Sequence, residues 1–205
     1  MTYRVLAVNP GSTSTKFAVY DGENQVFSST LNHSVEELSK FKSIIDQFEM
    51  RRTEIEKALK ENNVGLKSID AVVGRCGGLP PVKSGAYLIN DEMIDRLINR
   101  PTLDHASNLG AMISYSIAKE IGINSYIYDP VSVDECKDIS KVSGFKGLDR
   151  VCLTHALNTR AMAIKYSKMN NKNYKDLNLI VAHLGGGISL NVHEKGKMVD
   201  FVSDR

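Results

Sequence analysis

The sequence predicts an α/β fold that contains an internal duplication. Residues 5–20 have the pattern of a strand, a turn rich in glycine and hydroxyl groups, and a second strand, and residues 179–192 repeat that layout. Each segment continues into a further short apolar run, which predicts a three-stranded meander in each half. Between the two meanders, apolar runs of strand length alternate with amphipathic runs of helical length, as is typical of α/β proteins.

The two turns carry the donor groups that phosphate binding needs. Residues 9–16 combine a glycine, several hydroxyls and a lysine, and residues 183–189 combine a glycine triplet with a serine. Neither turn matches the Walker A or the dinucleotide pattern, because a strand follows each turn where those patterns require a helix. Two ordinary glycine-containing hairpins are the alternative for either turn alone. The shared layout favours a nucleotide-binding duplication in which two facing loops hold a phosphate chain.

Local patterns predict the elements between the meanders. Ser34 and Glu37 form a capping box that opens a long amphipathic helix ending near residue 62. The apolar run 69–74 predicts a strand parallel to the first one, because a helix separates the two. The remaining predicted elements are a short helix capped by Asp91, a helix from Ser107 to Ile121 stopped by Gly122, a strand over 125–128 and a helix over 153–168.

The composition limits the kinds of partner. The 205 residues have a net charge of +2, too small to indicate a nucleic-acid partner, and no apolar run approaches the length of a membrane span. Three cysteines outside metal-ligand spacing indicate reduced thiols and a cytoplasmic location, and no cluster of metal-ligating residues stands out. We therefore expect neither nucleic acid nor membrane as a partner.

The pattern predicts three segments. Residues 1–133 form a first domain, residues 134–150 are an irregular boundary, and residues 151–205 begin a second domain. Since the sequence stops after the third strand of the second meander, that second domain is expected to be truncated.

Three polar residues follow predicted strands at the edge where open α/β sheets bind ligands: Asn9, Arg75 and Asp129. Arg75 stands among glycines, and its planar guanidinium suits a carboxylate or a phosphate, although pairing with a surface acid is equally open. Asp129 taken alone favours a structural role as a cap before Pro130.

Three histidines are candidates for stabilising a transferring phosphoryl group: His105, His155 and His183. A structural hydrogen-bonding role is the alternative for each. His183 has the strongest case, because it precedes the second turn as Asn9 precedes the first.

These motifs are similar to those of the acetokinase family. The segments that carry the resemblance are Asn9–Lys16, Gly74–Gly78, Asp104–Gly110, Asp129–Val131, Thr154–Asn158 and His183–Ser189. Together they cover essentially the whole chain in the expected order. Pro10, Gly186 and the run from His105 to Gly110 resemble the butyrate kinase branch, whereas Cys76 departs from the family pattern.

The resemblance implies duplicated ribonuclease H-like domains of the actin and hexokinase type, the first nearly complete and the second truncated. It implies reversible phosphoryl transfer between ATP and butyrate, with Mg²⁺, giving butyryl phosphate and ADP. Acetate, propionate or a branched-chain fatty acid is the alternative substrate, and a non-catalytic truncated lobe is the alternative function. The full-length protein is expected to be a homo-oligomer, and the 205-residue chain alone is expected to be inactive, since a second arginine, a metal-binding glutamate and the adenosine-binding segment would follow residue 205.

The resemblance also implies roles for individual residues. Arg75 holds the carboxylate of the fatty acid, Asp129 orients the catalytic centre, and His155 lies near the transferring phosphoryl group. Asn9 and Ser12 lie near the Mg²⁺. The residues implied to bind ATP are Asn9, Gly11, Ser12, Thr13, Ser14, Lys16, His183, Gly185, Gly186, Gly187 and Ser189.

Overall fold

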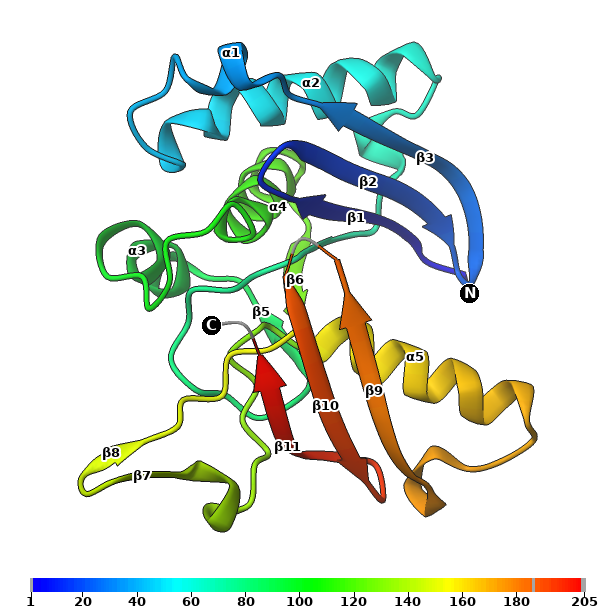
Figure 1. Ribbon diagram of the computed structural model, residues 1–205. Helices are drawn as coiled ribbons and strands as arrows, with labels where there is room; N and C mark the ends of the chain where they lie inside the picture. Colours follow the sequence, from blue (N-terminus) through cyan, green and yellow to red (C-terminus); the bar gives the residue numbers. More distant parts are fainter. Residues whose placement is uncertain (1, 186, 204–205) are drawn as a thin grey trace. The chain divides into compact units, whose positions relative to one another are not determined.

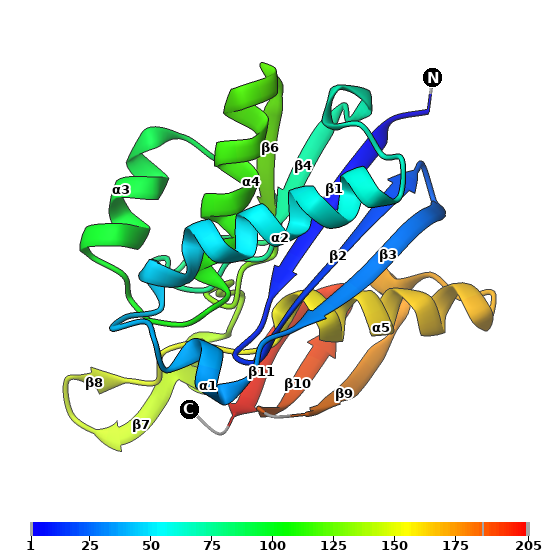
Figure 2. The same ribbon diagram turned by 90° about the horizontal axis from the view of Figure 1, so that it is seen from above.

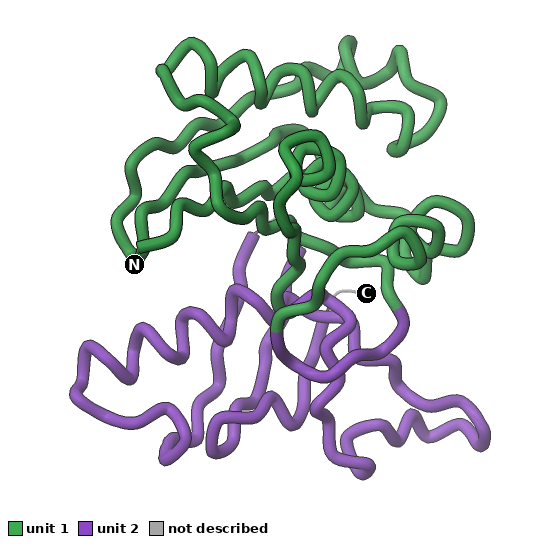
Figure 3. The backbone as a smooth tube through the Cα atoms, turned by 180° about the vertical axis from the view of Figure 1, so that it is seen from behind, with its two compact units in different colours: residues 1–79, 86–128 green, residues 80–85, 129–205 purple. Residues whose placement is uncertain are grey.

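The computed structural model describes residues 2–185 and 187–203, which form two compact units. Unit 1 contains the chain up to Leu79 together with Ala86–Tyr128, and unit 2 contains Pro80–Gly85 together with the chain from Asp129 onward (Figure 3). The short segment Pro80–Gly85 thus belongs to unit 2, although the residues on both sides of it belong to unit 1. Within the described residues, the helices are too short or too polar to cross a membrane.

Unit 1 is built on a mixed six-stranded sheet with the strand order β3-β2-β1-β4-β6-β5. Its strands are β1 (Arg4–Pro10), β2 (Ser14–Asp21), β3 (Asn24–Asn32), β4 (Ala71–Gly74), β5 (Ala86–Leu88) and β6 (Asn124–Tyr128). The antiparallel meander β1–β3 and the parallel pairing of β4 with β1 confirm the sequence predictions. Gly22 closes the turn between β2 and β3 with a φ of 61°, a conformation that glycine adopts without strain.

Two helices, α2 (Phe48–Glu61) and α4 (Asn108–Ile121), cover one face of this sheet (Figures 1 and 2). The core between the helices and the sheet is apolar and centres on Leu6, Val72, Ile55 and Ile113. As predicted, α4 ends at Gly122, whose φ of 76° lets the chain leave the helix in a left-handed turn. A second cluster, around Ile127 and Leu97, packs α3 (Asp91–Asn99) against the sheet edge.

The predicted long helix from Ser34 to residue 62 is wrong. The Ser34 cap does accept the N–H of Glu37 at 3.1 Å, but the helix it opens, α1 (Val35–Leu38), is a single turn. Side chains then compete with the helical pattern, because the Ser39 hydroxyl bonds the Glu36 carbonyl and Asp46 accepts the N–H of Ser43. A 3₁₀ turn at Ile45–Gln47 leads into α2.

Unit 2 contains the second meander, β9 (Asn178–Leu184), β10 (Ile188–Glu194) and β11 (Lys197–Ser203), as predicted. The helix α5 (Ala156–Met169) packs against β9 and β10. Behind the meander, Met198 and Phe201 form a small apolar core with Val133, Cys152 and Ala156.

Smaller differences concern element ends. Asn90, not Asp91, caps α3 by accepting the N–H of Met93, and α5 begins three residues later than predicted. The edge strand β5 was not predicted, and the segment 134–150, expected to be irregular, contains the 3₁₀ turn Asp138–Lys141 and the exposed pair β7 (Val142–Phe145) and β8 (Leu148–Asp149). Further 3₁₀ turns lie at Leu66–Ser68 and Tyr174–Asp176.

Candidate active site

The first glycine-rich turn of the sequence is a tight connection between β1 and β2. Pro10 pairs with Thr15, and the Gly11 N–H donates to the Ser14 carbonyl at 2.7 Å. The side chains of Ser12 and Thr13 are exposed at the tip of the turn. The turn therefore presents hydroxyl groups to solvent, as a phosphate-binding loop must.

Asn9 and Arg75 lie together at the ends of neighbouring parallel strands. The N–H of Arg75 bonds the Val8 carbonyl at 2.9 Å, so the chain leaving β4 stays beside β1. The Arg75 Nη1 donates to the Asn9 Oδ1 at 3.4 Å. On β2, Lys16 pairs in register with Asn9 and is exposed. Two cationic side chains and an amide thus occur at one end of this sheet.

A close backbone contact fixes the position of Arg75. A Cβ atom on Gly74 would lie 2.2 Å from the Gly110 carbonyl oxygen, and a Cβ on Gly110 would lie 2.3 Å from the Arg75 carbonyl oxygen. Only glycine permits α4 to approach β4 so closely. The start of this helix therefore sets where Arg75 lies.

Arg51, which the sequence reading did not single out, holds the first turn from inside. This α2 residue is fully buried. Its Nη1 donates to the carbonyls of Gly11 (2.9 Å) and Ser14 (3.2 Å), and its Nη2 donates to the Ser12 carbonyl at 3.2 Å. Burial lowers the pKa of Arg51 from its ordinary value. Because these carbonyls point inward to the Arg51 guanidinium, the backbone of the turn is held in one conformation.

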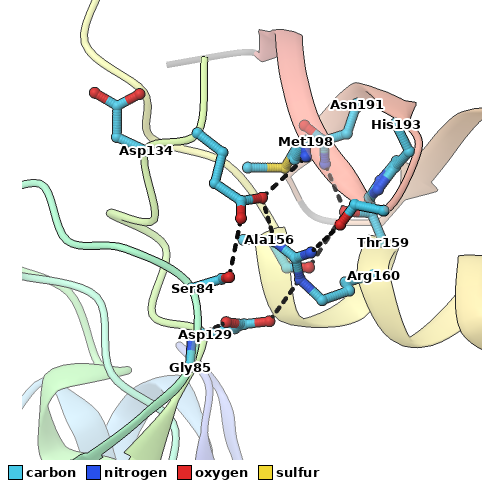
Figure 4. A network of polar contacts seen from close by, with 12 residues as sticks. Ser84, Gly85, Asp129, Asp134, Ala156, Thr159, Arg160, Asn191, His193 and Met198 are labelled. Atoms are coloured by element: carbon cyan, nitrogen blue, oxygen red, sulfur yellow. Dashed lines mark hydrogen bonds and ion pairs between the residues drawn. The ribbon is translucent and has the colours of Figure 1, made fainter. Parts of the chain in front are cut away.

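In unit 2, Asp129 belongs to a buried ion-pair network (Figure 4). Its Oδ2 accepts from the Arg160 Nε at 2.8 Å, and its Oδ1 accepts from the Gly85 N–H at 2.8 Å. Arg160 also donates to the Glu135 carboxylate at 2.6 Å and to the Gly196 carbonyl at 3.1 Å. The backbone φ of Asp129 is 39°, which is unusual for a residue other than glycine.

The charges in this network stabilise one another. Burial acts to lower the pKa of Arg160, but hydrogen bonding to Glu135 and the charges of Glu135 and Asp129 outweigh it and raise that pKa. Burial acts to raise the pKa of Glu135, but bonds from the Met198 N–H and from Arg160 lower it overall. Asp129 is therefore a structural anchor for Arg160, and both of its oxygens are engaged within unit 2.

The structure brings together three site residues predicted in the second half of the sequence. His155, at the start of α5, shares a hydrogen bond of 2.9 Å between its Nδ1 and the buried Ser189 Oγ. The rings of His155 and His183 stack with centroids 3.9 Å apart and planes at 12°. The His183 Nδ1 donates to the Asn158 Oδ1 at 3.2 Å. A stacked histidine pair thus lies beside the second glycine-rich turn.

At the second turn, Gly185 lies close to the His183 ring. A Cβ on Gly185 would approach the His183 Nε2 to 3.3 Å. Gly187 follows on the way into β10, and Gly186 lies outside the described residues. Below the turn, Thr154, Asn191 and Thr159 form a buried chain of hydrogen bonds that ties α5 to β10.

His105 belongs to unit 1. Its Nδ1 accepts from the Ser107 N–H at 3.1 Å and lies 3.0 Å from the Ser107 hydroxyl, just before α4. These contacts match the structural alternative given for this residue.

Two clusters of metal-ligating groups that the sequence did not reveal occur among the described residues. One contains Asp134, Cys136 and Cys152, and the other contains His33, Glu37 and Glu54. The spacing of their members along the chain matches no ligand motif, so only the tertiary fold brings them together.

No protein-family model matches the chain. Over 200 residues it is 48% identical to "Butyrate kinase 2" of Clostridium acetobutylicum, and over 198 residues it is 48% identical to "Butyrate kinase 1" of the same organism. The first match covers 98% of this chain and 56% of the relative, the second 97% and 56%.

Solved structures agree on the fold. The acetate kinase of Porphyromonas gingivalis superposes with a TM-score of 0.68 at 16% identity, over 97% of this chain and 57% of that one. A propionate kinase from Francisella tularensis gives a TM-score of 0.65 at 16% identity, over 98% and 57%. The chain is therefore a butyrate kinase homologue with an acetate kinase-like α/β fold, and it spans about half the length of the curated relatives it matches.

Proposed function

We propose that this chain carries the carboxylate-binding and phosphate-binding parts of a short-chain carboxylate kinase, with butyrate as the acid. The observation that carries the proposal is 48% identity to butyrate kinases over almost the entire chain. In the proposed reaction, a carboxylate oxygen attacks the γ-phosphorus of ATP, the bond to the β-phosphate oxygen breaks, and butyryl phosphate and ADP form. The same site runs the reverse reaction.

The two glycine-rich turns are proposed to hold the phosphates of ATP. Gly11, Ser12, Thr13 and Lys16 are proposed to form the first loop, where Ser12, Thr13 and Lys16 are exposed and Gly11 is half-buried. Gly185, Gly186, Gly187 and Ser189 are proposed to supply the second loop, with Ser14 supporting the first. Phosphoryl transfer requires little covalent catalysis by the protein. The main tasks of these groups are therefore to position the phosphates of ATP and to neutralise their charge.

Arg75 is proposed to bind the carboxylate of the acid. Its guanidinium contacts the Asn9 amide oxygen and is placed by the contact between β4 and α4. A planar fork of N–H donors matches the two oxygens of a carboxylate.

The stacked pair of His155 and His183 is proposed to lie near the transferring phosphoryl group. Imidazole N–H groups donate hydrogen bonds to phosphoryl oxygens, and the bonds to Ser189 and Asn158 fix both rings. Asp129 is proposed to orient this centre indirectly, since it anchors Arg160 at the side of α5.

Mg²⁺ is proposed to accompany ATP. The Asn9 amide oxygen and the Ser12 hydroxyl are oxygen donors of the kind that Mg²⁺ prefers, and both side chains are exposed. Because Arg75 donates to that amide oxygen, Asn9 fits a contact through a metal-bound water better than direct ligation. The bound ion would neutralise phosphate charge.

The two units, which divide the chain between Tyr128 and Asp129, are proposed to correspond to the two members of a duplicated ribonuclease H-like fold. The repeated antiparallel meander in each unit supports this proposal.

Trapping of acyl phosphate as a hydroxamate, with butyrate and acetate run side by side, tests the activity. Butyrate-dependent product above the acetate level is expected of a butyrate kinase. A preference for acetate would reject the choice of butyrate. Binding of ADP without any turnover would favour a non-catalytic lobe.

Replacing Arg75 tests the carboxylate role. Arg75→Ala removes a charged donor worth about 1.5–3 kcal/mol, so we expect the KM for butyrate to rise roughly 10- to 100-fold, with little change in the KM for ATP. Arg100→Ala, which removes an exposed arginine paired with Asp95, is the control. If the chain shows no turnover, dissociation constants for butyrate measured by NMR replace KM. Equal effects on acid and nucleotide would contradict the assignment.

A further inference from the structure

Three potential metal ligands converge beneath the first turn, in unit 1. His33 follows β3, Glu37 lies in α1, and Glu54 lies in α2. The His33 Nδ1 is 3.5 Å from the Glu54 Oε2 and 3.8 Å from the Glu37 Oε2. All three donor atoms lie within 4.8 Å of one another.

Two of these atoms are buried without a hydrogen-bond partner among the described residues. They are the Nδ1 of His33, a residue that is 4% exposed, and the Oε2 of Glu54. The distances of 3.5 and 3.8 Å are too long for hydrogen bonds. A buried polar atom without a partner costs about 1–3 kcal/mol, so two such atoms facing each other indicate that a further group lies between them.

The spacing fits a metal ion. A zinc ion bound at about 2.1 Å in tetrahedral geometry places its ligand atoms about 3.4 Å apart. The two distances from the His33 Nδ1 are close to this value. One imidazole nitrogen with two carboxylate oxygens is a donor set that first-row divalent metals accept, whereas Mg²⁺ prefers oxygen alone.

We propose that His33, Glu37 and Glu54 form a binding site for a divalent transition-metal ion, with Zn²⁺ as the ion that fits best. The site goes beyond the proposed kinase activity and is separate from the Mg²⁺ that would accompany ATP.

The surroundings of His33 match those of a metal ligand. Its second ring nitrogen, Nε2, lies 2.9 Å from the Thr15 hydroxyl, and its backbone N–H donates to the Thr13 carbonyl at 2.9 Å. Ligand histidines typically use the other ring nitrogen in such a bond, which fixes the ring. Ser34 caps the turn that carries Glu37.

Charge and access are also suitable. Together, the carboxylates of Glu37 and Glu54 and the nearby guanidinium of the buried Arg51 carry a net charge of −1, so Arg51 reduces but does not cancel the attraction of the site for a cation. The side chains of Glu37 and Glu54 are 36% and 34% exposed, so an ion can reach the site from solvent. Because Thr13 and Thr15 belong to the first turn, a bound ion would tie α1 and α2 to it.

The competing explanation is a protonated His33 between two carboxylates. In that state Nδ1 carries a proton at neutral pH and Zn²⁺ has no place to bind. The experiment therefore has to distinguish metal binding from a charged histidine.

Zn²⁺ binding is measured on the 205-residue chain by competition with a chromophoric chelator. The parent for all variants is Cys136→Ser, which removes the thiol cluster of Asp134, Cys136 and Cys152 as a second zinc site. We expect one Zn²⁺ per chain and a rise in Tm with Zn²⁺. Glu54→Gln and Glu37→Gln should each weaken binding at least about tenfold, whereas Glu36→Gln, on the same turn, should not. Circular dichroism checks that each variant folds. If Glu54→Gln does not fold, the zinc affinity of Glu37→Gln decides the test.

NMR of the histidine ring nitrogens gives a second readout, with His33→Gln identifying the His33 signals. Zn²⁺ should shift the Nδ1 signal of His33 and leave Nε2 protonated. Equal zinc affinity in Glu37→Gln and the parent would overturn the proposal. So would an Nδ1–H signal that persists in the presence of Zn²⁺.

Discussion

At the scale of single residues, the shape of the first turn depends on one buried guanidinium. Arg51 donates to three carbonyls of the turn, those of Gly11, Ser12 and Ser14, and also to the side chains of Thr15 and Gln47. Carbonyls that accept from a fixed donor cannot rotate toward solvent, so the exposed Ser12 and Thr13 stay at the tip of the turn. A binding loop of this kind is preorganised from the inside of unit 1.

Replacing Arg51 should destabilise unit 1 strongly. Arg51→Met keeps much of the side-chain volume but leaves several buried acceptors without donors, so we expect a loss of about 3 kcal/mol in the free energy of unfolding, measured with urea. The neighbouring Arg52 pairs with Glu56 and Glu120 nearer the surface, and Arg52→Met should cost only about 1 kcal/mol. Equal losses would show that burial of Arg51 does not matter.

His193 makes stability depend on pH. It is fully buried, and burial together with the charge of Arg160 lowers its pKa from 6.5 to about 4. Below pH 6.5, His193 becomes protonated in the unfolded chain but stays neutral in the folded chain. The free energy of unfolding therefore falls as the pH drops from 6.5 toward 4. Above that window the contribution is fully present.

The variant His193→Asn, which keeps a polar atom for the Tyr174 hydroxyl, should show a flatter pH dependence of unfolding across this window. An unchanged slope would assign the acid sensitivity to other groups. Ring NMR should show His193 neutral at pH 6.

The sequence allowed prediction of the site residues next to turns, but not of the residues whose roles depend on partners distant in the sequence. Asn9 and His183 are the second-last residues of β1 and β9, and Arg75 directly follows β4, so their positions at strand ends were predictable from spacing. Arg51 and Arg160 are helix residues whose charges resemble ordinary surface arginines in the sequence. Their partners lie 36 to 40 residues away for the first turn and 25 to 36 residues away for the second network.

At the scale of elements, the meanders and crossovers were predictable because strand pairing follows apolar periodicity and hairpin turns. The helix predicted from residue 34 failed because its apolar spacing continues through a segment where Ser39 and Asp46 bond the backbone instead. The short strand β5 was missed because it has only three residues and pairs at an edge. Periodicity describes which face is buried, and side-chain bonds to the backbone decide where an element stops.

The packing of α4 on β4 gives a prediction about glycine. Gly110→Ala places a methyl group 2.3 Å from a backbone oxygen that cannot move aside easily, so we expect a loss of at least about 2 kcal/mol and a displaced Arg75. Gly65→Ala is the matched control, because its Cβ meets nothing within 4 Å and its φ of −74° is ordinary. That change should be neutral or stabilise by up to about 1 kcal/mol. Thermal unfolding of both variants measures the change in stability. An unchanged stability in Gly110→Ala would show that α4 can move away from β4.

At the scale of the whole molecule, each unit has its own core and its own buried arginine. In unit 2, Arg160 joins four separate segments, through Asp129, Glu135, Gly196 and, by way of Glu135, Ser84. Breaking such a buried network leaves carboxylates without a counter-charge. The effect should be confined to the unit that contains it.

Hydrogen exchange followed by mass spectrometry can test this confinement. Arg160→Met should destabilise unit 2 by about 3–5 kcal/mol and speed amide exchange there, while α2 and α4 keep their protection. Lys137→Met, which removes an exposed ion pair with Glu194, should cost about 0–1 kcal/mol. Loss of protection throughout unit 1 would mean that the two units unfold together.

The segment Pro80–Gly85 has a consequence for synthesis on the ribosome. It is translated between two parts of unit 1, yet Ser84 bonds Glu135, which is added 51 residues later. At about 5–20 residues per second, this part of the nascent chain waits roughly 3–10 s for its partner. A gene fragment that starts at codon 129 would omit the segment altogether. It would encode Val133 without the Val82 that pairs with it and Asp129 without the Gly85 that donates to it.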